Sequence, residues 1–212
     1  MKFRALLLAA LLGSTAAQAA TELVTNGSFE TSSVASGSFA SVSSLAGWTI
    51  AGKKSTVELR NDLVGAAESG AVFAELDSSK NTTISQRLNT VVGETYTLSF
   101  WYASRPGVLG NSLGLQWLVG SESGTVDTYS GTLAKQVINA TADNIWVNFT
   151  TSFVATSTST ALSFAGLGKS DGLGTSLDNI SVTQTSVPEP TSISMLLAGL
   201  VAMGLMSRRK PR

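Results

Sequence analysis

The 212-residue sequence contains no cysteine and no histidine. Without cysteine it can form no disulfide framework, no thiolate metal site and no thiol nucleophile. Without histidine it can form neither a Ser-His-Asp triad nor the usual zinc and haem sites. Carboxylate chemistry of the glycosidase type therefore remains the most accessible route to catalysis.

Charge is also scarce, with only 13% charged residues and a formal net charge of zero. The balance is uneven along the chain, because six of the 14 basic residues lie in the two terminal segments described below, together with one of the 14 acidic residues. The central segment therefore keeps 8 basic and 13 acidic residues, a net charge of about −5. A mildly acidic segment without a basic cluster argues against a nucleic-acid partner.

Long helical runs are missing between the termini, whereas Ser, Thr and Gly are abundant. The clearest strand is Thr95–Ala103, where Tyr96, Leu98, Phe100 and Tyr102 alternate with small residues and Trp101. A second strand is predicted at 145–153, with Ile145, Val147 and Phe149 facing inward. Further strands are expected at 56–60, 71–76, 82–88, 113–119, 125–133, 160–165 and 177–184. Many short strands at this spacing predict a β-sandwich, and the Ser-rich stretch 31–44 is expected to be a long surface loop.

The N-terminus has the features of a secretory signal peptide. Lys2 and Arg4 precede the apolar run 5–12, and Ala17-Gln18-Ala19 forms an A-x-A cleavage site. We therefore expect cleavage after Ala19 and a β-sandwich domain over residues 20–186.

The C-terminal segment 187–212 has three parts in a fixed order. Pro188, Glu189 and Pro190 form a turn, an apolar helix is expected over 191–206, and Arg208, Arg209 and Lys210 lie in the basic end. A helix of 16 residues is about 24 Å long at 1.5 Å per residue. The hydrocarbon core of a bilayer is about 30 Å thick, so a transient membrane signal fits this segment better than a permanent anchor.

This three-part pattern resembles the PEP-CTERM sorting signals of exopolysaccharide-producing Gram-negative bacteria. The resemblance implies recognition by an exosortase, a transient tether in the inner membrane, and delivery to the cell surface or the extracellular matrix. Whether the tail is cleaved or retained stays open at this point.

A second resemblance covers most of residues 20–186. It rests on short motifs in a fixed order, at 26–30, 47–48, 73–77, 84–86, 93–100 and 176–182. These motifs are similar to the galactose-binding-like jelly rolls, which include carbohydrate-binding modules and related plant cell-wall proteins. The resemblance implies an all-β jelly-roll sandwich and a non-catalytic protein that associates with exopolysaccharide or another surface glycan.

Two other functions remain open. One is a purely structural matrix protein without a ligand. The other is a glycoside hydrolase that uses a carboxylate pair, either Glu75 with Asp77 or Glu58 with Asp62. Residues two apart on a strand share a face at about 7 Å, within the range of an acid/base pair. Charged residues on a strand are nevertheless more often its solvated face.

The jelly-roll resemblance also implies a structural Ca²⁺ held by acidic positions near both ends of the domain. Glu30 and Asp178 match those positions, and Asp77 is a third candidate, with backbone carbonyls completing the oxygen shell. Simple alternation turns Asp178 towards the core with Ile180 and Val182, where an unpaired carboxylate is costly. A β-bulge that turns it outward is the alternative.

Trp101, with Trp146 as second choice, is the candidate for sugar stacking. Trp101 shares its predicted face with Thr97, Ser99 and Ala103, whereas the large apolar residues occupy the other face. An exposed indole among hydroxyl groups suits the C–H face and hydroxyl rim of a pyranose. The alternative is that loops or a neighbouring molecule cover this face and that Trp101 packs there. Trp48 and Trp117 are predicted to be core residues.

Overall fold

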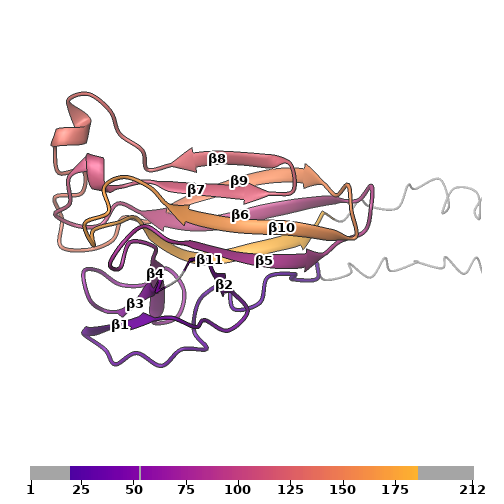
Figure 1. Cartoon of the computed structure of the whole chain (residues 1–212), viewed down its shortest axis with the longest axis horizontal. Helices are drawn as coiled ribbons and strands as arrows, with labels where there is room; N and C mark the ends of the chain where they lie inside the picture. The colour runs from indigo at the N-terminus through magenta and orange to yellow at the C-terminus, as the bar shows by residue number, and fades with distance from the viewer. Residues whose placement is uncertain (1–19, 53, 186–212) are drawn as a thin grey trace, which may run out of the picture. The chain divides into compact units, whose positions relative to one another are not determined.

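The alternation of apolar and polar side chains produces a sandwich of two antiparallel sheets, as the sequence predicts (Figure 1). The structure, a computed structural model, describes residues 20–52 and 54–185. The predicted signal peptide and the predicted sorting signal, with its apolar helix, lie outside the described residues. Within the described residues, no helix is long and apolar enough to cross a membrane.

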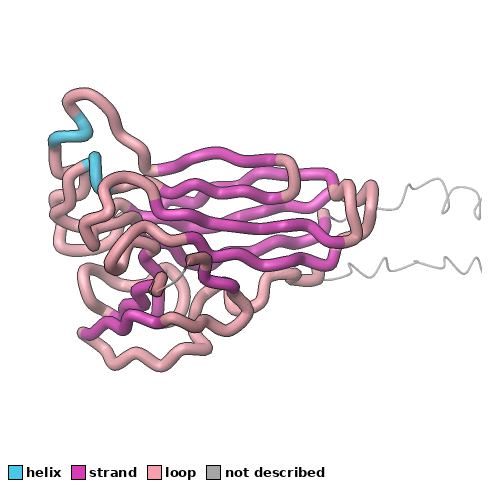
Figure 2. The backbone as a smooth tube through the Cα atoms, in the orientation of Figure 1, coloured by secondary structure: helices cyan, strands magenta, loops and turns pink. Residues whose placement is uncertain are grey.

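The strands and the two short 3₁₀ helices follow one another in the order β1 (Ser38–Val42), β2 (Thr49–Ile50), β3 (Val57–Asn61), β4 (Val72–Glu75), β5 (Thr83–Asn89), β6 (Thr95–Ala103), η1 (Gly110–Ser112), β7 (Leu115–Val119), β8 (Glu122–Val126), η2 (Leu133–Lys135), β9 (Val147–Val154), β10 (Ser159–Gly166) and β11 (Ser176–Gln184). One sheet has six strands in the order β1-β3-β4-β11-β6-β9. The other has five strands in the order β2-β5-β10-β7-β8. Figure 2 shows the two 3₁₀ helices at one end of the sandwich.

The core lies between the sheets and is centred on Phe100 of β6. Its ring centroid is 5.0 Å from those of Phe149 on β9 and Phe164 on β10. Each such aromatic pair contributes about 0.5–1.5 kcal/mol beyond the burial of its area. Trp48 and Trp117 are both 7% exposed, which confirms their prediction as core residues.

β6 has the predicted bounds and β9 begins two residues later than expected, but two other predictions were wrong. The expected loop 31–44 contains β1, an edge strand whose side chains are exposed or half-buried, so its sequence carries little apolar signal. The strand expected at 125–133 is β8, and it already ends at Val126. The next residue, Asp127, has a φ of 56° and turns the chain out of the sheet.

Both described ends of the compact unit Thr21–Thr185 lie at the same end of the sandwich. The amide of Leu23 donates to the Val182 carbonyl, and the amide of Thr185 donates to the carbonyl of Thr95, where β6 begins. β6 then runs for nine residues to Ala103. At about 3.3 Å per residue, its far end lies about 27 Å from Thr185, on the side of the 3₁₀ helices in Figure 1.

Loop 62–71 covers part of the outer face of the six-stranded sheet, where the sequence predicted a solvated face, whereas the outward-facing residues Asn148, Thr150 and Ser152 of β9 are exposed. Arg60 lies opposite Phe73, and Asp178 lies opposite Trp101. Arg60, Phe73 and Asp178 are at most 1% exposed. Loop 62–71 covers this part of the face, since its amides donate to Asp178 and its Ala66 carbonyl accepts the indole N–H of Trp146.

Candidate functional site

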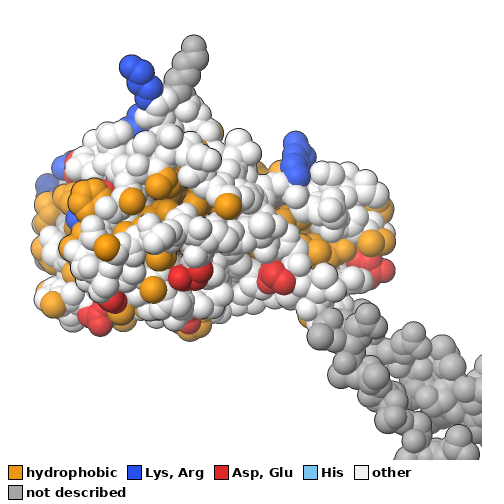
Figure 3. Space-filling model, turned by 90° about the horizontal axis from the view of Figure 1, so that it is seen from below, with side chains coloured by type: hydrophobic (Ala, Val, Ile, Leu, Met, Phe, Trp, Pro, Cys, Tyr) orange, Lys and Arg blue, Asp and Glu red, His pale blue; other side chains and the backbone are white. Residues whose placement is uncertain are grey.

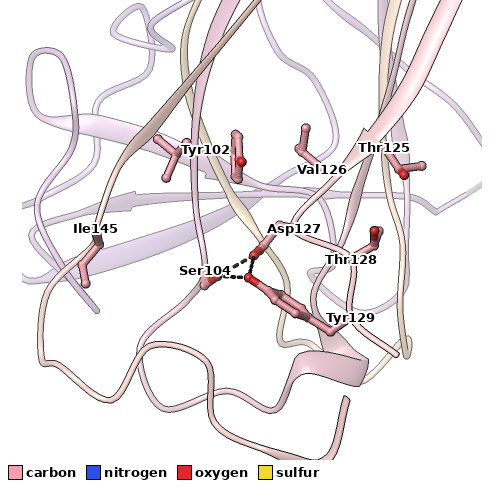
Figure 4. A pocket seen from close by; sticks show the side chains of 9 residues that line it. Tyr102, Ser104, Thr125, Val126, Asp127, Thr128, Tyr129 and Ile145 are labelled. Carbon is pink, nitrogen blue, oxygen red and sulfur yellow. Dashed lines mark hydrogen bonds between the residues drawn. The ribbon is translucent and has the colours of Figure 1, made fainter. Parts of the chain in front are cut away.

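A pocket of about 250 Å³ opens at the far end of β6, between the two sheets (Figure 4). Its lining comes from the end of β6, the end of β8 with the residues that follow it, and the start of β9. We call it the tyrosine pocket, and it is lined by Tyr102, Ser104, Thr125, Val126, Asp127, Thr128, Tyr129, Ile145 and Val147.

Asp127 is the polar centre of the tyrosine pocket. Its Oδ1 accepts hydrogen bonds from the Ser104 hydroxyl at 2.5 Å and from the Tyr129 hydroxyl at 2.8 Å, and its Oδ2 accepts one from Thr175 at 2.5 Å. The left-handed backbone of Asp127 brings its carboxylate to the end of β6 (Figure 4). Such a conformation costs a non-glycine residue about 1–2 kcal/mol, and conformations of this kind cluster at functional sites.

Burial changes the pKa values of two ionisable groups in the pocket. It raises the pKa of Asp127, while the hydroxyls of Ser104, Thr175 and Tyr129 act in the opposite direction. Burial also raises the pKa of Tyr102, and the Asp127 carboxylate adds to the shift. The phenol of Tyr102 therefore stays neutral to a higher pH than usual.

The pocket combines two half-buried tyrosine rings, exposed aliphatic side chains at Ile145 and Val147, and hydroxyls around a carboxylate. Flat apolar surfaces beside fixed hydrogen-bonding groups are suited to a ring that carries hydroxyls. Asp127 is the one acidic side chain in its lining, so the pocket lacks the two flanking carboxylates of a typical glycoside hydrolase.

This pocket was not predicted from the sequence. Tyr102 was expected on the inward face of β6, and Asp127 and Tyr129 were assigned to a strand that in fact ends at Val126. A carboxylate two residues before a tyrosine, next to a strand end, was the available signal. Only the turn at Asp127 and the pairing of β6 with β9 bring these residues together.

Three of the carboxylates proposed as catalytic pairs, Glu58, Glu75 and Asp62, form ion pairs or hydrogen bonds within the protein. Glu58 and Glu75 lie opposite each other on β3 and β4, and Arg60 lies between them. Arg60 Nη2 is 2.6 Å from Glu58 Oε1, and its Nη1 is 2.9 Å from Glu75 Oε2. The second contact is an ion pair without hydrogen-bond geometry. Asp62 accepts a hydrogen bond from the Ser36 hydroxyl instead.

Arg105 completes this charge cluster, which we define as Glu58, Arg60, Glu75 and Arg105. Its Nη1 lies 3.2 Å from Glu75 Oε1 and donates to the Gly172 carbonyl at 2.9 Å. Burial raises the pKa of Glu75 to about 8, although both guanidinium groups act to lower it. The cluster is almost closed to solvent, with the side chains of Glu75 and Arg60 exposed by 0% and 1%.

The three predicted calcium ligands all accept backbone N–H groups. Asp178 binds the amides of Glu68, Ser69 and Asn179 at 2.7–3.0 Å. Glu30 binds the amides of Ala71 and Val72, and Asp77 binds those of Asp171 and Gly172. Glu30 and Asp178 thus hold the same short segment, 68–72, and so connect the two ends of the domain through a loop.

The residues in the described ranges form no group of three or more acidic side chains that could hold a metal ion. Asp178 faces outward because a β-bulge between Asp178 and Ser181 reverses the alternation of β11, so simple alternation was wrong for this residue. The calcium ion stays a prediction.

Substitution of Asp178 distinguishes the stability contributed by its hydrogen bonds to backbone amides from the stability that a bound metal ion would contribute. Asp178→Asn puts an amide group against N–H donors, so we expect a loss of about 1–3 kcal/mol in the free energy of unfolding. Urea unfolding in EGTA measures the loss of these amide bonds alone. A larger loss in millimolar calcium would assign Asp178 to a metal site as well, and equal losses would contradict the predicted calcium ion.

The two predicted stacking residues lie on the outer side of the six-stranded sheet. Trp101 is half-buried between Asp178 and Asn148. Trp146 is also half-buried, donates its indole N–H to the Ala66 carbonyl at 3.0 Å, and packs edge-on against Phe73 at 5.7 Å. Neither indole is fully exposed. Loop 62–71 contacts Trp146, and the alternation of residues within a strand carries no information about such a loop.

The part of the surface seen in Figure 3 carries scattered single charges with apolar atoms between them.

Both the central part of the chain and its tail are similar to known protein families. Residues 22–183 match a family described as "Protein of unknown function (DUF642)". The chain belongs to the DUF642 family. Residues 186–210 match the PEP-CTERM protein-sorting motif, which confirms the prediction from the tail and indicates export to the cell surface in Gram-negative bacteria.

The curated relatives are two multifunctional-autoprocessing repeats-in-toxin proteins. The one from Vibrio cholerae is 33% identical over 125 residues, or 58% of this chain. The one from Vibrio vulnificus is 33% identical over 126 residues, or 59% of the chain. The matched part spans only 2% of either toxin.

Two solved structures share the fold of this DUF642 chain. TmCBM61 in complex with β-1,4-galactotriose has a TM-score of 0.51 and 19% identity, covering 78% of this chain and 99% of that one. A cyclase from Fischerella sp. TAU has a TM-score of 0.53 and 14% identity, covering 80% and 100%. The jelly-roll sandwich predicted from the sequence is therefore confirmed, and it is a fold that serves both a binding module and an enzyme.

Proposed function

We propose that this protein is a non-catalytic protein of the cell surface or the extracellular matrix that binds a polysaccharide in the tyrosine pocket. An exosortase recognises its tail and delivers it. The main support for this proposal is the arrangement of Tyr102, Asp127 and Tyr129, which combines aromatic surfaces with one fixed carboxylate and surrounding hydroxyls. TmCBM61, which shares the fold, holds a galactotriose.

The position of the pocket supports display at a surface. Thr185, the last residue of the compact unit, lies beside the start of β6, whereas the tyrosine pocket lies at the end of that strand. A domain held through the segment that follows Thr185 thus carries its pocket at the opposite end, about 27 Å along β6.

A paired substitution tests the site. Tyr102 and Trp101 are neighbours in the chain that face opposite sides of β6, so the two variants compare the pocket with the outer face. We expect Tyr102→Ala to weaken binding about ten-fold, the loss of a contact of about 1.4 kcal/mol. Trp101→Ala should leave binding unchanged.

The measurement is a glycan array for selection, followed by affinity electrophoresis of the purified protein and both variants in the selected polysaccharide. Thermal melting checks that each variant is folded. Retention lost only in Trp101→Ala would move the site to the outer face. Binding to no glycan favours a purely structural role, and cleavage of the glycan would reveal a hydrolase.

A further inference from the structure

A second pocket opens on the same side of the sandwich. This side lies between β9, the edge of the six-stranded sheet, and β8, the edge of the five-stranded sheet. The second pocket has a volume of about 440 Å³ and is lined by Thr95, Ser121, Glu122, Ser152, Phe153, Val154 and Thr156. We call it the Glu122 pocket.

The two pockets lie at opposite ends of the same two strands. Along β9, Val147 lines the tyrosine pocket and Phe153 lines the Glu122 pocket. Both residues face inward, opposite Tyr102 and Tyr96 of β6. Six residues separate them, or about 20 Å at 3.3 Å per residue. β8 runs the other way, from Glu122 in one pocket to Val126 in the other.

The inward-facing residues between the two pockets carry no charge. On β9 these residues are Phe149 and Thr151, both half-buried. On β8 the facing residue is Gly124, which lies opposite Trp117. A Cβ at Gly124 would lie 2.9 Å from the Trp117 ring, so a larger residue there would displace the indole. The buried indole N–H of Trp117 has no acceptor among the described residues.

The charges in the two pockets restrict the ligand. Each lining contains one carboxylate, Asp127 or Glu122, and neither lining contains a lysine or an arginine. A polymer with carboxylate or sulfate groups would meet negative charge at both ends without a compensating cation. Neutral sugars avoid this repulsion, and their hydroxyls can donate to both carboxylates.

We propose that the tyrosine pocket and the Glu122 pocket are the two ends of one groove that binds an internal stretch of a neutral, linear polysaccharide. This proposal rests on the proposed function of the tyrosine pocket and adds the length and charge of its ligand. A chain that occupies both pockets gains the second contact without a second association step, so its affinity exceeds that of a short fragment.

A length series of oligosaccharides tests this proposal by isothermal titration calorimetry. The probes are neutral β-linked glucan, galactan and xylan fragments of increasing length, with polygalacturonate fragments as the acidic comparison. The double variant Glu122→Gln/Val154→Ser alters the second pocket at two exposed positions, and Ser123→Ala, also exposed on β8 but outside both linings, is the matched control.

For wild type and Ser123→Ala we expect affinity to rise with the length of one neutral series and then to level off. The double variant should bind the long fragments about ten-fold more weakly and the shortest ones unchanged. Affinity that is independent of length, or unchanged in the double variant, overturns the groove but leaves the tyrosine pocket standing if Tyr102→Ala still weakens binding about ten-fold. Preference for the acidic series, or binding to none of the probes, also overturns it.

Discussion

Arg60→Met is expected to reduce the free energy of unfolding by about 3–5 kcal/mol, the usual cost of removing one partner from a buried ion pair. Arg60 is 1% exposed and is the cation shared by Glu58 and Glu75. Methionine replaces the aliphatic part of the arginine side chain but leaves both carboxylates without this partner, and Glu75 keeps only Arg105. Urea unfolding of wild type and variant measures the loss.

The loss should depend on pH in a defined direction. Burial raises the pKa of Glu75 from 4.5 to about 8, so between these values the folded state binds more protons than the unfolded state. The stability contributed by this group is therefore full at acid pH and falls as the pH rises towards 8. Arg60 is the main influence that lowers the pKa of Glu75, so its removal raises that pKa further. The deficit of Arg60→Met should be larger at about pH 8 than at about pH 5.

Arg87→Met is the matched control, since Arg87 is an exposed residue of β5. Exposed charges contribute about 0–1 kcal/mol, so this variant should remain close to wild type at both pH values. Equal losses in the two variants, or a deficit that shrinks as the pH rises, would contradict the account of the charge cluster.

Gly27→Ala should have a comparably large effect through steric conflict. The Gly27 carbonyl accepts the amide of Ile180 at 3.0 Å, within the β-bulge of β11. A Cβ at Gly27 would lie only 1.9 Å from the carbonyl oxygen of Ile180. The obstacle is backbone, which cannot rotate away, so we expect a loss of about 3 kcal/mol or more in the free energy of unfolding.

Gly93→Ala is the control, since it makes the same glycine-to-alanine change at a position where the new Cβ meets no other atom. Gly93 has a φ of +86° and no atom within 4 Å of its Cβ position, so alanine there meets backbone strain without a clash. That strain costs about 1–2 kcal/mol. If Gly27→Ala unfolds in urea at the same midpoint as Gly93→Ala, the two ends of the domain are not packed as tightly as the structure has them.

The sequence predicted strands well where one face alternates strictly with the other. β6 has its predicted bounds because four large apolar residues alternate with small residues and Trp101, and Gly93 and Pro106 lie outside its ends. β1 was missed because an edge strand with no buried side chain leaves no such pattern.

Asp178 shows a different limit of prediction from sequence, namely that alternation cannot reveal a β-bulge. Alternation assigns this residue to the core, and one extra residue in a bulge reverses the assignment. Trp101 shows the same limit, because its face is set by β6 but its neighbours Asp178 and Asn148 come from β11 and β9. The tyrosine pocket combines three separate segments, 102–104, 125–129 and 145–147, and only the fold brings them together.

The central claim is that a glycan binds between the ends of β6, β8 and β9. Chemical-shift mapping of the isotope-labelled protein with the glycan selected on the array tests it most directly. The account predicts that the largest amide shifts occur at residues 102–104, 125–129 and 145–147. Shifts confined to the amides around Trp101 and loop 62–71, with those three segments unmoved, would contradict it.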